Sequence, residues 1–174
     1  PNAVNVWNEL DLYLKSRFKT ESGRSIAISA TCCDSGGHHT NQVYAFTKPR
    51  QGRRIFAIKG ASVPGKPIVS KPSFVGKNQT ALYTVGTDTA KENIFARLNA
   101  DDDSQTLHFP ADLEEEYFKQ LTAEKRITKW IRGRKTLAWK QIRPRNEALD
   151  VTVYNFAAIY ILNPNFDLIE ERLL

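Results

Sequence analysis

Hydrophobic positions recur along this chain either about every fourth residue or in short continuous runs, and the two patterns divide it into helices and strands. Apolar residues at every fourth position predict a helix over residues 4–18, which Gly23 is expected to end. A run of small and apolar residues at 25–33 then closes on Asp34 and two glycines. Such a run is typical of a buried strand in a parallel sheet.

The same patterns continue to the end of the chain. Further helices are predicted at 38–48, 89–98, 112–121 and 146–162, further strands at 54–59, 81–85, 107–109 and 136–142, a proline-rich loop or edge excursion at 60–80, and no settled structure at 122–131. Thr89 and Glu92 have the spacing of a capping box, and Asn146 is placed to cap the last helix. We therefore expect an α/β fold with a largely parallel sheet and right-handed crossovers, as one domain over 1–162 with a tail at 163–174.

The composition is that of an ordinary globular domain, with 41% hydrophobic and 25% charged residues. No apolar run approaches the roughly 18 residues that a membrane span needs, and no signal-peptide pattern is present, so a cytoplasmic location is expected. Cys32 and Cys33 are adjacent, and neighbouring strand residues point to opposite faces, so we expect both to be reduced packing residues.

The charge is unevenly distributed. The net charge is +6, with basic clusters at 48–54, 66–77 and 125–145 and acidic ones at 101–103 and 112–116. This segregation favours a nucleic-acid partner. The chain starts at Pro1 and has no methionine, so we expect it to be part of something longer.

Asp34 is the first candidate for chemistry. It follows a predicted strand at the edge where α/β sheets bind ligands, and Gly36 and Gly37 would let a metal or phosphate approach closely. The alternative is a turn aspartate that binds nearby backbone amides.

Asp150 is the second candidate. It lies one helical turn after Glu147 on a largely apolar helix, where a buried carboxylate is costly unless it is paired or binds a metal. Acids that complement the helix dipole are the alternative, and this explains Glu147 better than Asp150. Asp88 also follows a strand, but a capping role is the stronger reading there.

Three familiar motifs do not fit. Gly60–Lys66 resembles a phosphate-binding loop, but the next residue is Pro67, which has no hydroxyl for Mg²⁺ and cannot continue the pattern. The cysteines with His38 and His39 match no common zinc spacing. No nucleophile elbow is present. Carboxylates from separate elements instead suggest a site for Mg²⁺ or Mn²⁺, ions that support phosphodiester cleavage.

Several strings occur in an order that resembles one family. They are Cys33-Asp-Ser-Gly-Gly-His-His-Thr40, Ile58-Lys-Gly-Ala61, Val85-Gly-Thr-Asp-Thr-Ala-Lys91, Leu107-His-Phe-Pro110, Gln120-Leu-Thr-Ala-Glu124 and Arg145-Asn-Glu-Ala-Leu-Asp150. Together they resemble the nuclease domain of lambda-like phage terminase large subunits over roughly residues 5–162.

The resemblance implies an RNase H-like α/β fold, a mixed sheet flanked by helices, in a protein that also carries a packaging ATPase. It implies that Asp34 and Asp150 hold Mg²⁺ or Mn²⁺, with Glu147 or Asp88 as further ligands, and that the protein cuts concatemeric double-stranded DNA. It also implies that a terminase small subunit and a portal are partners. The family's first catalytic acid lies on a strand ahead of the first helix here, so the N-terminal strands are expected to be missing and the site of the isolated chain is expected to be incomplete.

The basic residues nearest these acids are candidate phosphate contacts, namely Arg53, Arg54, Lys135, Arg143, Arg145, His38 and His39. Two other functions stay open. One is a non-catalytic DNA-binding or partner-docking fragment, and the other is a different RNase H-like nuclease, such as a resolvase or integrase.

Overall fold

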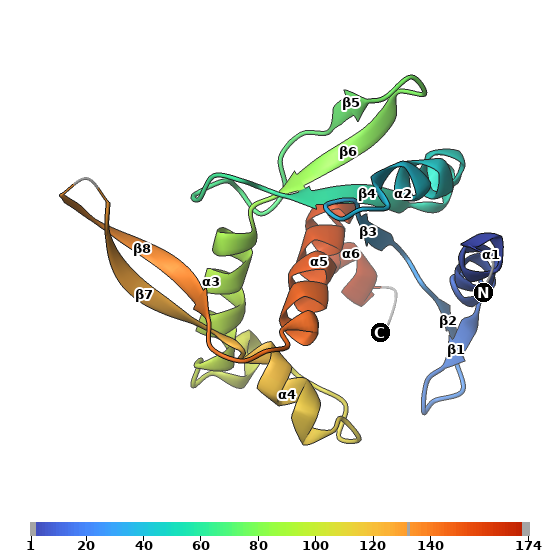
Figure 1. Cartoon of the computed structure of the whole chain (residues 1–174). Coiled ribbons are helices and arrows are strands. Elements are labelled where there is room, and N and C mark those ends of the chain that lie inside the picture. The colour runs from blue at the N-terminus through green and yellow to red at the C-terminus, as the bar shows by residue number, and fades with distance from the viewer. Residues whose placement is uncertain (1–2, 132, 172–174) are drawn as a thin grey trace. The chain divides into compact units, whose positions relative to one another are not determined.

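The computed structural model describes residues 3–131 and 133–171, which form two compact units. The first unit comprises Pro1–Lys59 and Pro72–Tyr83, and the second comprises Gly60–Lys71 and Thr84–Leu174. The chain thus passes from one unit to the other after Lys59, after Lys71 and after Tyr83. The elements are described below unit by unit (Figure 1).

The first unit is built around a four-stranded sheet. Its elements are α1 (Ala3–Tyr13), β1 (Arg17–Lys19), β2 (Ser25–Ala27), β3 (Thr31–Asp34), α2 (Thr40–Thr47), the 3₁₀ helix η1 (Lys48–Arg53), β4 (Ile55–Gly60), β5 (Ser73–Val75) and β6 (Thr80–Val85). The strand order is β3-β4-β6-β5, in which β3 runs parallel to β4 and β5 runs antiparallel to β6. The sheet is therefore mixed, as the family resemblance implies. It keeps the expected parallel pairing at β3–β4, and the proline-rich excursion adds the antiparallel edge strand β5.

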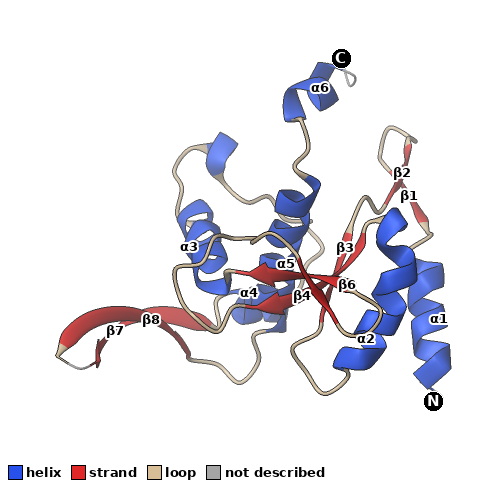
Figure 2. Cartoon of the chain, turned by 90° about the horizontal axis from the view of Figure 1, so that it is seen from above, coloured by secondary structure: helices blue, strands red, loops and turns tan. Residues whose placement is uncertain are grey.

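Both long helices of this unit cover one face of the sheet (Figure 2). Val43 of α2 packs on Ala57 of β4 and Leu82 of β6, and Trp7 of α1 lies against the same cluster. The ring of Trp7 also contacts the ring of Phe46, with 4.8 Å between centroids. The predictions of a helix near 38–48 and of strands near 54–59 and 81–85 are confirmed.

The first predicted helix is too long. Helix α1 ends at Tyr13, and β1 and β2 then form an antiparallel hairpin in which Phe18 lies opposite Ile26. Gly23 lies in the turn of this hairpin with φ of +81°, a conformation that glycine adopts without strain. Phe18 continues the helical spacing only by coincidence, because strand pairing determines its conformation. The predicted strand at 25–33 is accordingly split into β2 and β3.

Strand β3 lies at an edge of the sheet and is only half buried, so the expectation of a fully buried strand is also wrong. Cys32 and Cys33 are both free thiols, as expected, and Cys33 packs on the core cluster. Burial raises the pKa of Cys32 to about 12, with the neighbouring thiol adding to the effect, and the pKa of Cys33 to about 11.

The second unit is mainly helical. Its elements are α3 (Thr87–Leu98), the 3₁₀ helix η2 (Asp103–Gln105), α4 (Glu115–Leu121), β7 (Glu124–Ile131), β8 (Arg134–Gln141), α5 (Glu147–Leu162) and α6 (Phe166–Glu171). Helix α5 packs on α3 and α4 through buried side chains that include Ile94, Leu121, Leu149 and Val153. Within the described ranges, no helix is long and apolar enough to cross a membrane.

Most predictions for this unit hold. Helix α5 begins directly after Asn146 and ends at Leu162, and β8 matches the strand predicted at 136–142. Strand β7 forms where no structure was assigned, and residues 107–109 form no strand. Strands β7 and β8 pair only with each other and make a long antiparallel hairpin that extends away from α3 and α4 (Figure 1).

The start of α3 differs from the predicted capping box. The helix begins two residues earlier than predicted, and Thr89 lies inside its first turn. The Thr89 hydroxyl donates to the carbonyl of Lys66 at 2.6 Å, so it holds the preceding loop. The amide of Gly86 donates to the carbonyls of Pro67 and Ile68, and a Cβ on Gly86 would lie 2.3 Å from the oxygen of Lys66. The end of the segment that resembles a phosphate-binding loop is therefore held at the start of α3 by these hydrogen bonds, which is a structural role. No helix follows the segment directly.

Candidate active site

Asp34 ends strand β3 in the first unit, opposite Ile58 of β4, and its side chain is exposed. Its Oδ1 accepts a hydrogen bond from the amide of Gly36 at 2.9 Å. A Cβ on Gly36 would lie 3.2 Å from the same oxygen, which is tighter than ordinary contact. The turn alternative considered for Asp34 is therefore present, and it fixes the carboxylate at the end of the strand.

The turn after Asp34 is itself firmly held. Ser35 is buried, and both its amide and its hydroxyl donate to the carbonyl of Ile58, at 2.9 and 2.8 Å. Thr40, at the start of α2, donates to the carbonyls of Ser35 at 2.7 Å and Gly37 at 2.9 Å. Hydrogen bonds to β4 and from α2 therefore fix the backbone that follows Asp34.

Asp150 lies in the second unit, in the first turns of α5, and is half buried. Its amide donates to the carbonyl of Asn146, which begins the helical ladder. Glu147 is exposed and accepts from Arg145 Nε at 3.3 Å, in an ion pair with both side chains 61% exposed. Asp88 is half buried in the first turn of α3.

A buried charge network fixes the segment that leads into α5. Lys91 of α3 and Glu124 of β7 are only 8% and 7% exposed, and the ammonium of Lys91 donates to both carboxylate oxygens, at 2.8 and 2.7 Å. Asn146 Nδ2 donates to Glu124 Oε1 at 3.0 Å. Asn146 therefore occupies the N-cap position as expected, but its side chain binds Glu124 and makes no capping hydrogen bond to the helix.

A second buried side chain satisfies the start of α5. Gln120 of α4 accepts from the amide of Ala148 at 3.3 Å, and its own amide group donates to Glu116 at 3.1 Å. The amides in the first turn of a helix have no hydrogen-bond partner within the helix, and the side-chain oxygen of Gln120 accepts from one of them. Elements α3, α4 and β7 thus all hold the helix start that carries Asp150.

The sequence patterns did not indicate a role for Lys91, Glu124 or Gln120. Each lies within a string that carries the family resemblance, but the partners Lys91 and Glu124 are 33 residues apart, and no local pattern pairs them. A lysine between Ala90 and Ile94, both fully buried, was the available signal. Asp34 and Asp150, which the sequence did single out, belong to different units.

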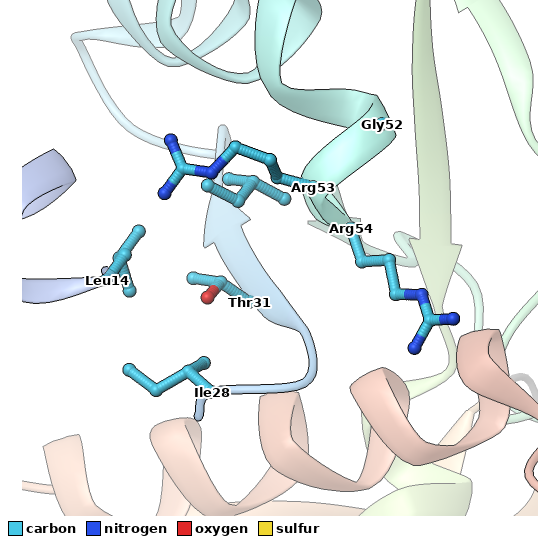
Figure 3. A pocket seen from close by; sticks show the side chains of 7 residues that line it. Leu14, Ile28, Thr31, Gly52, Arg53 and Arg54 are labelled. Atoms are coloured by element: carbon cyan, nitrogen blue, oxygen red, sulfur yellow. The ribbon is translucent and has the colours of Figure 1, made fainter. Parts of the chain in front are cut away.

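The basic candidates of the first unit lie around α2 and η1. His38 and His39 are exposed just before α2, and Arg54 is exposed with φ of 59°. Arg53 donates to Asp11 Oδ1 at 2.5 Å, so its charge is already partly neutralised. Arg53 and Arg54 point away from each other beside a hollow of about 400 Å³ (Figure 3), which is lined by Leu14, Ile28, Thr31, Gly52, Arg53, Arg54 and Ile55.

The basic candidates of the second unit lie on or near the β7–β8 hairpin. Lys135 is exposed on β8, and Arg143 and Arg145 are exposed in the segment between β8 and α5. Arg145 is paired with Glu147, as described above. Arg143 and Arg145 therefore directly precede the helix that carries Asp150, whereas Lys135 lies near the tip of the hairpin, opposite Trp130.

The carboxylates of Asp34 and Asp150 are hard oxygen donors, which suit Mg²⁺ or Mn²⁺. No group of three or more His, Cys, Asp or Glu side chains within the described ranges is placed to hold a metal ion. Mg²⁺ is commonly bound through one or two carboxylates, with water and substrate phosphates as the other ligands. Asp34 and Asp150 are each, taken alone, carboxylates of the type that such a site uses.

Comparison with known proteins supplies the biological context. The family model of the terminase large subunit gpA endonuclease domain matches residues 1–172. The terminase large subunit of Escherichia phage lambda is 39% identical over 162 residues, which cover 87% of this chain and 25% of that protein. That of Enterobacteria phage P21 is 36% identical over 170 residues, which cover 92% of this chain and 26% of that protein. The chain spans about a quarter of the length of these relatives. No solved structure gives a significant match.

Proposed function

The chain belongs to the family of terminase large subunit endonuclease domains, and we propose that it is a divalent-metal-dependent nuclease domain, RNase H-like in fold, that cuts concatemeric viral DNA during packaging. The family match favours this function over a resolvase or an integrase. The proposed metal is Mg²⁺ or Mn²⁺, and the proposed ligands are Asp34 and Asp150, with Glu147 or Asp88 as further ligands.

The anchoring of Asp150 is the observation that carries this proposal. A buried Lys91–Glu124 pair and a buried Gln120 both fix the helix start that presents this carboxylate. Burying an ion pair rarely adds net stability, since desolvation offsets the attraction. Such pairs are better explained where they hold a functional group at a defined position.

Each residue has a separate task in this proposal. The bound ion would activate a water molecule and stabilise the leaving oxygen of a phosphodiester. Asp34 and Asp150 hold it, and the turn at Ser35 and the network at Glu124 keep the two carboxylates oriented. Exposed basic residues such as Arg54, Lys135 and Arg143 neutralise substrate phosphates.

The partners follow from the same proposal. Double-stranded DNA is the substrate, and a terminase small subunit and a portal are the expected protein partners in the cytoplasm of a bacterial host. The basic balance of the chain, with a net charge of +6, supports a polyanionic substrate.

Nicking of supercoiled plasmid tests the proposal. We expect nicking with Mn²⁺ or Mg²⁺ and none with EDTA, and a loss of more than about 100-fold in Asp150→Asn and Asp34→Asn, which keep side-chain shape but remove the charge. Asp112→Asn, at an exposed acid before α4, is the matched control and should retain wild-type nicking. Nicking that survives EDTA, or that is unchanged in Asp150→Asn, would refute the metal site.

A non-catalytic DNA-binding or docking role is the second candidate, and the net charge of +6 fits it as well as it fits cleavage. The same assay should therefore include a version extended at the N-terminus by the preceding residues of its reading frame. Cleavage by either version that is lost in Asp150→Asn supports the nuclease. Cleavage by neither, with DNA binding intact, supports the binding role.

A further inference from the structure

The hairpin of β7 and β8 carries an unusual share of the positive charge. Residues 124–141, which make up the hairpin, contain seven Lys and Arg residues and one acid, the buried Glu124, whereas the whole chain has 25 basic and 19 acidic residues. Outside the hairpin the basic and acidic residues are therefore equal in number, with 18 of each. The positive charge of the protein is thus concentrated on one hairpin, and a uniformly charged solvated surface does not explain that distribution.

The two faces of the hairpin have different surroundings. Arg126 lies opposite Trp139, and this face lies against α3: Arg126 Nη2 is 2.7 Å from Glu92 Oε1, and the Trp139 ring is 4.9 Å from the Phe95 ring between centroids. The other face carries Lys125 opposite Lys140, and Lys129 opposite Thr136. We call Lys125, Lys129 and Lys140 the lysine face.

The lysine face is exposed, and no ion pair neutralises it within the part of the chain that the structure describes. Like charges directly opposite one another destabilise a strand pair, so the Lys125–Lys140 pair opposes folding of the hairpin. The Lys125–Lys140 repulsion would be relieved by an external polyanion bound against this face.

The base of the hairpin is fixed and the rest projects. Glu124, the first residue of β7, is held by Lys91 and Asn146, so the hairpin is rigidly attached to α3 and to the start of α5. Beyond its contacts with α3 the hairpin extends outward (Figure 1), and Trp130 near its tip is 71% exposed. A two-stranded ribbon of this kind has dimensions that fit the major groove of duplex DNA.

We propose that the β7–β8 hairpin is a DNA-binding arm whose lysine face contacts the phosphate backbone of duplex DNA. The identification of DNA as the polyanion rests on the proposed function, but the binding itself requires no metal and no cleavage. The arm begins at Glu124, whose contacts with Lys91 and Asn146 also fix the start of the helix that carries Asp150. DNA bound to the hairpin is therefore connected to that helix through this network.

Fluorescence anisotropy with a labelled 25-base-pair duplex in EDTA, over a series of KCl concentrations, tests the arm. In Lys125→Gln/Lys129→Gln/Lys140→Gln we expect binding at least about tenfold weaker, and a log–log salt slope less steep by about 2.7, since each phosphate contact contributes about 0.9. The control Lys66→Gln/Lys71→Gln/Lys119→Gln removes three exposed lysines of the same unit and should leave the slope unchanged. Replacing the lysine face with arginines should preserve binding.

The proposal is overturned if the control weakens binding as much as the lysine-face variant, or if the lysine-face variant keeps the wild-type slope. It is also overturned as a duplex site if a single strand of the same length binds more tightly and loses affinity in Trp130→Ala, which would indicate stacking of unpaired bases. Thermal unfolding checks that each variant folds. If the triple variant does not, Lys129→Gln alone should reduce the slope by about 0.9.

The outcomes separate this inference from the proposed nuclease. If the protein does not nick plasmid and the lysine-face variant loses DNA binding, the DNA-binding arm is supported and the nuclease function is not. If the protein nicks plasmid in a way that depends on Asp150 and the lysine-face variant binds DNA like wild type, the nuclease function is supported and the DNA-binding arm is not.

Discussion

Asp11, in the first unit, forms ion pairs with three basic side chains. Its carboxylate accepts from Arg50 at 2.8 Å, from Lys15 at 2.7 Å and from Arg53 at 2.5 Å. These partners, Arg50 above all, hold the pKa of Asp11 well below its usual range. The cluster ties α1 to η1, and it means that Arg53 can contact a phosphate only by sharing its charge with Asp11.

The depressed pKa predicts a pH-dependent contribution to stability. The folded state keeps Asp11 ionised where the unfolded chain would protonate it, so the contribution is complete above about pH 4 and is lost as the pH falls further. We expect Asp11→Asn to lower the melting temperature at pH 7, and the difference from wild type to shrink below pH 4. Glu9→Gln, at an exposed acid of the same helix, should have little effect at either pH. A difference that stays constant down to pH 2 would contradict this assignment.

At the same scale, the sequence predicted residues whose role is local and missed those whose partners are distant. The turn at Asp34 could be anticipated because an aspartate followed by two glycines binds an amide two residues on, as Gly36 shows. Lys91 could not be paired with Glu124 in the same way, because their contact depends on how α3 and β7 pack. Whether Asp34 and Asp150 share one metal stays a prediction.

At the scale of elements, the Lys91–Glu124 pair should behave as a unit. Removing one partner leaves a buried charge, so we expect Lys91→Met and Glu124→Leu each to lower the free energy of unfolding by about 3–5 kcal/mol. The double variant should lose much less than the sum of the two, and urea denaturation measures all three. Glu92→Gln, which breaks the half-exposed pair with Arg126, should cost no more than about 1 kcal/mol. Additive losses in the double variant would show that the two charges are not coupled.

Element type was predictable wherever one face of a segment packs on a core. Helix α5 and strands β4 and β6 follow their apolar patterns closely, because burial produced those patterns. The pattern failed at β1 and β2, whose residues are all exposed, so no buried face marks their period. It also failed at Thr89, where a tertiary hydrogen bond to Lys66 replaces the expected local cap.

At the scale of the whole molecule, the class of fold was predictable and its division was not. Alternating helices and strands indicated an α/β protein, and the ordered strings indicated the family, which the match over residues 1–172 confirms. The proline-rich segment was recognised as an excursion. Residues 60–71 belong to a different unit from their neighbours on both sides. This assignment depends on packing between distant segments, which local patterns do not encode.

This division predicts how fragments behave. A fragment ending at residue 71 keeps β3 and β4 but lacks β5, β6 and the core residue Leu82, and two strands are seldom stable alone. We expect fragment 1–71 to show no cooperative thermal transition by circular dichroism, and fragment 1–85, which restores both strands, to regain one. Cooperative melting of fragment 1–71 would mean that β6 is dispensable to the first unit.

The interleaving of the two units also constrains how genes for such proteins can be recombined. A single crossover between two related genes, placed anywhere from residue 60 to residue 83, cannot exchange one unit intact, because part of at least one unit always comes from the other parent. Exchange of a whole unit needs breakpoints matched at all three passages of the chain. Chimaeras joined at a single point in this interval should therefore inherit mismatched packing, whereas joints outside it disturb one unit only.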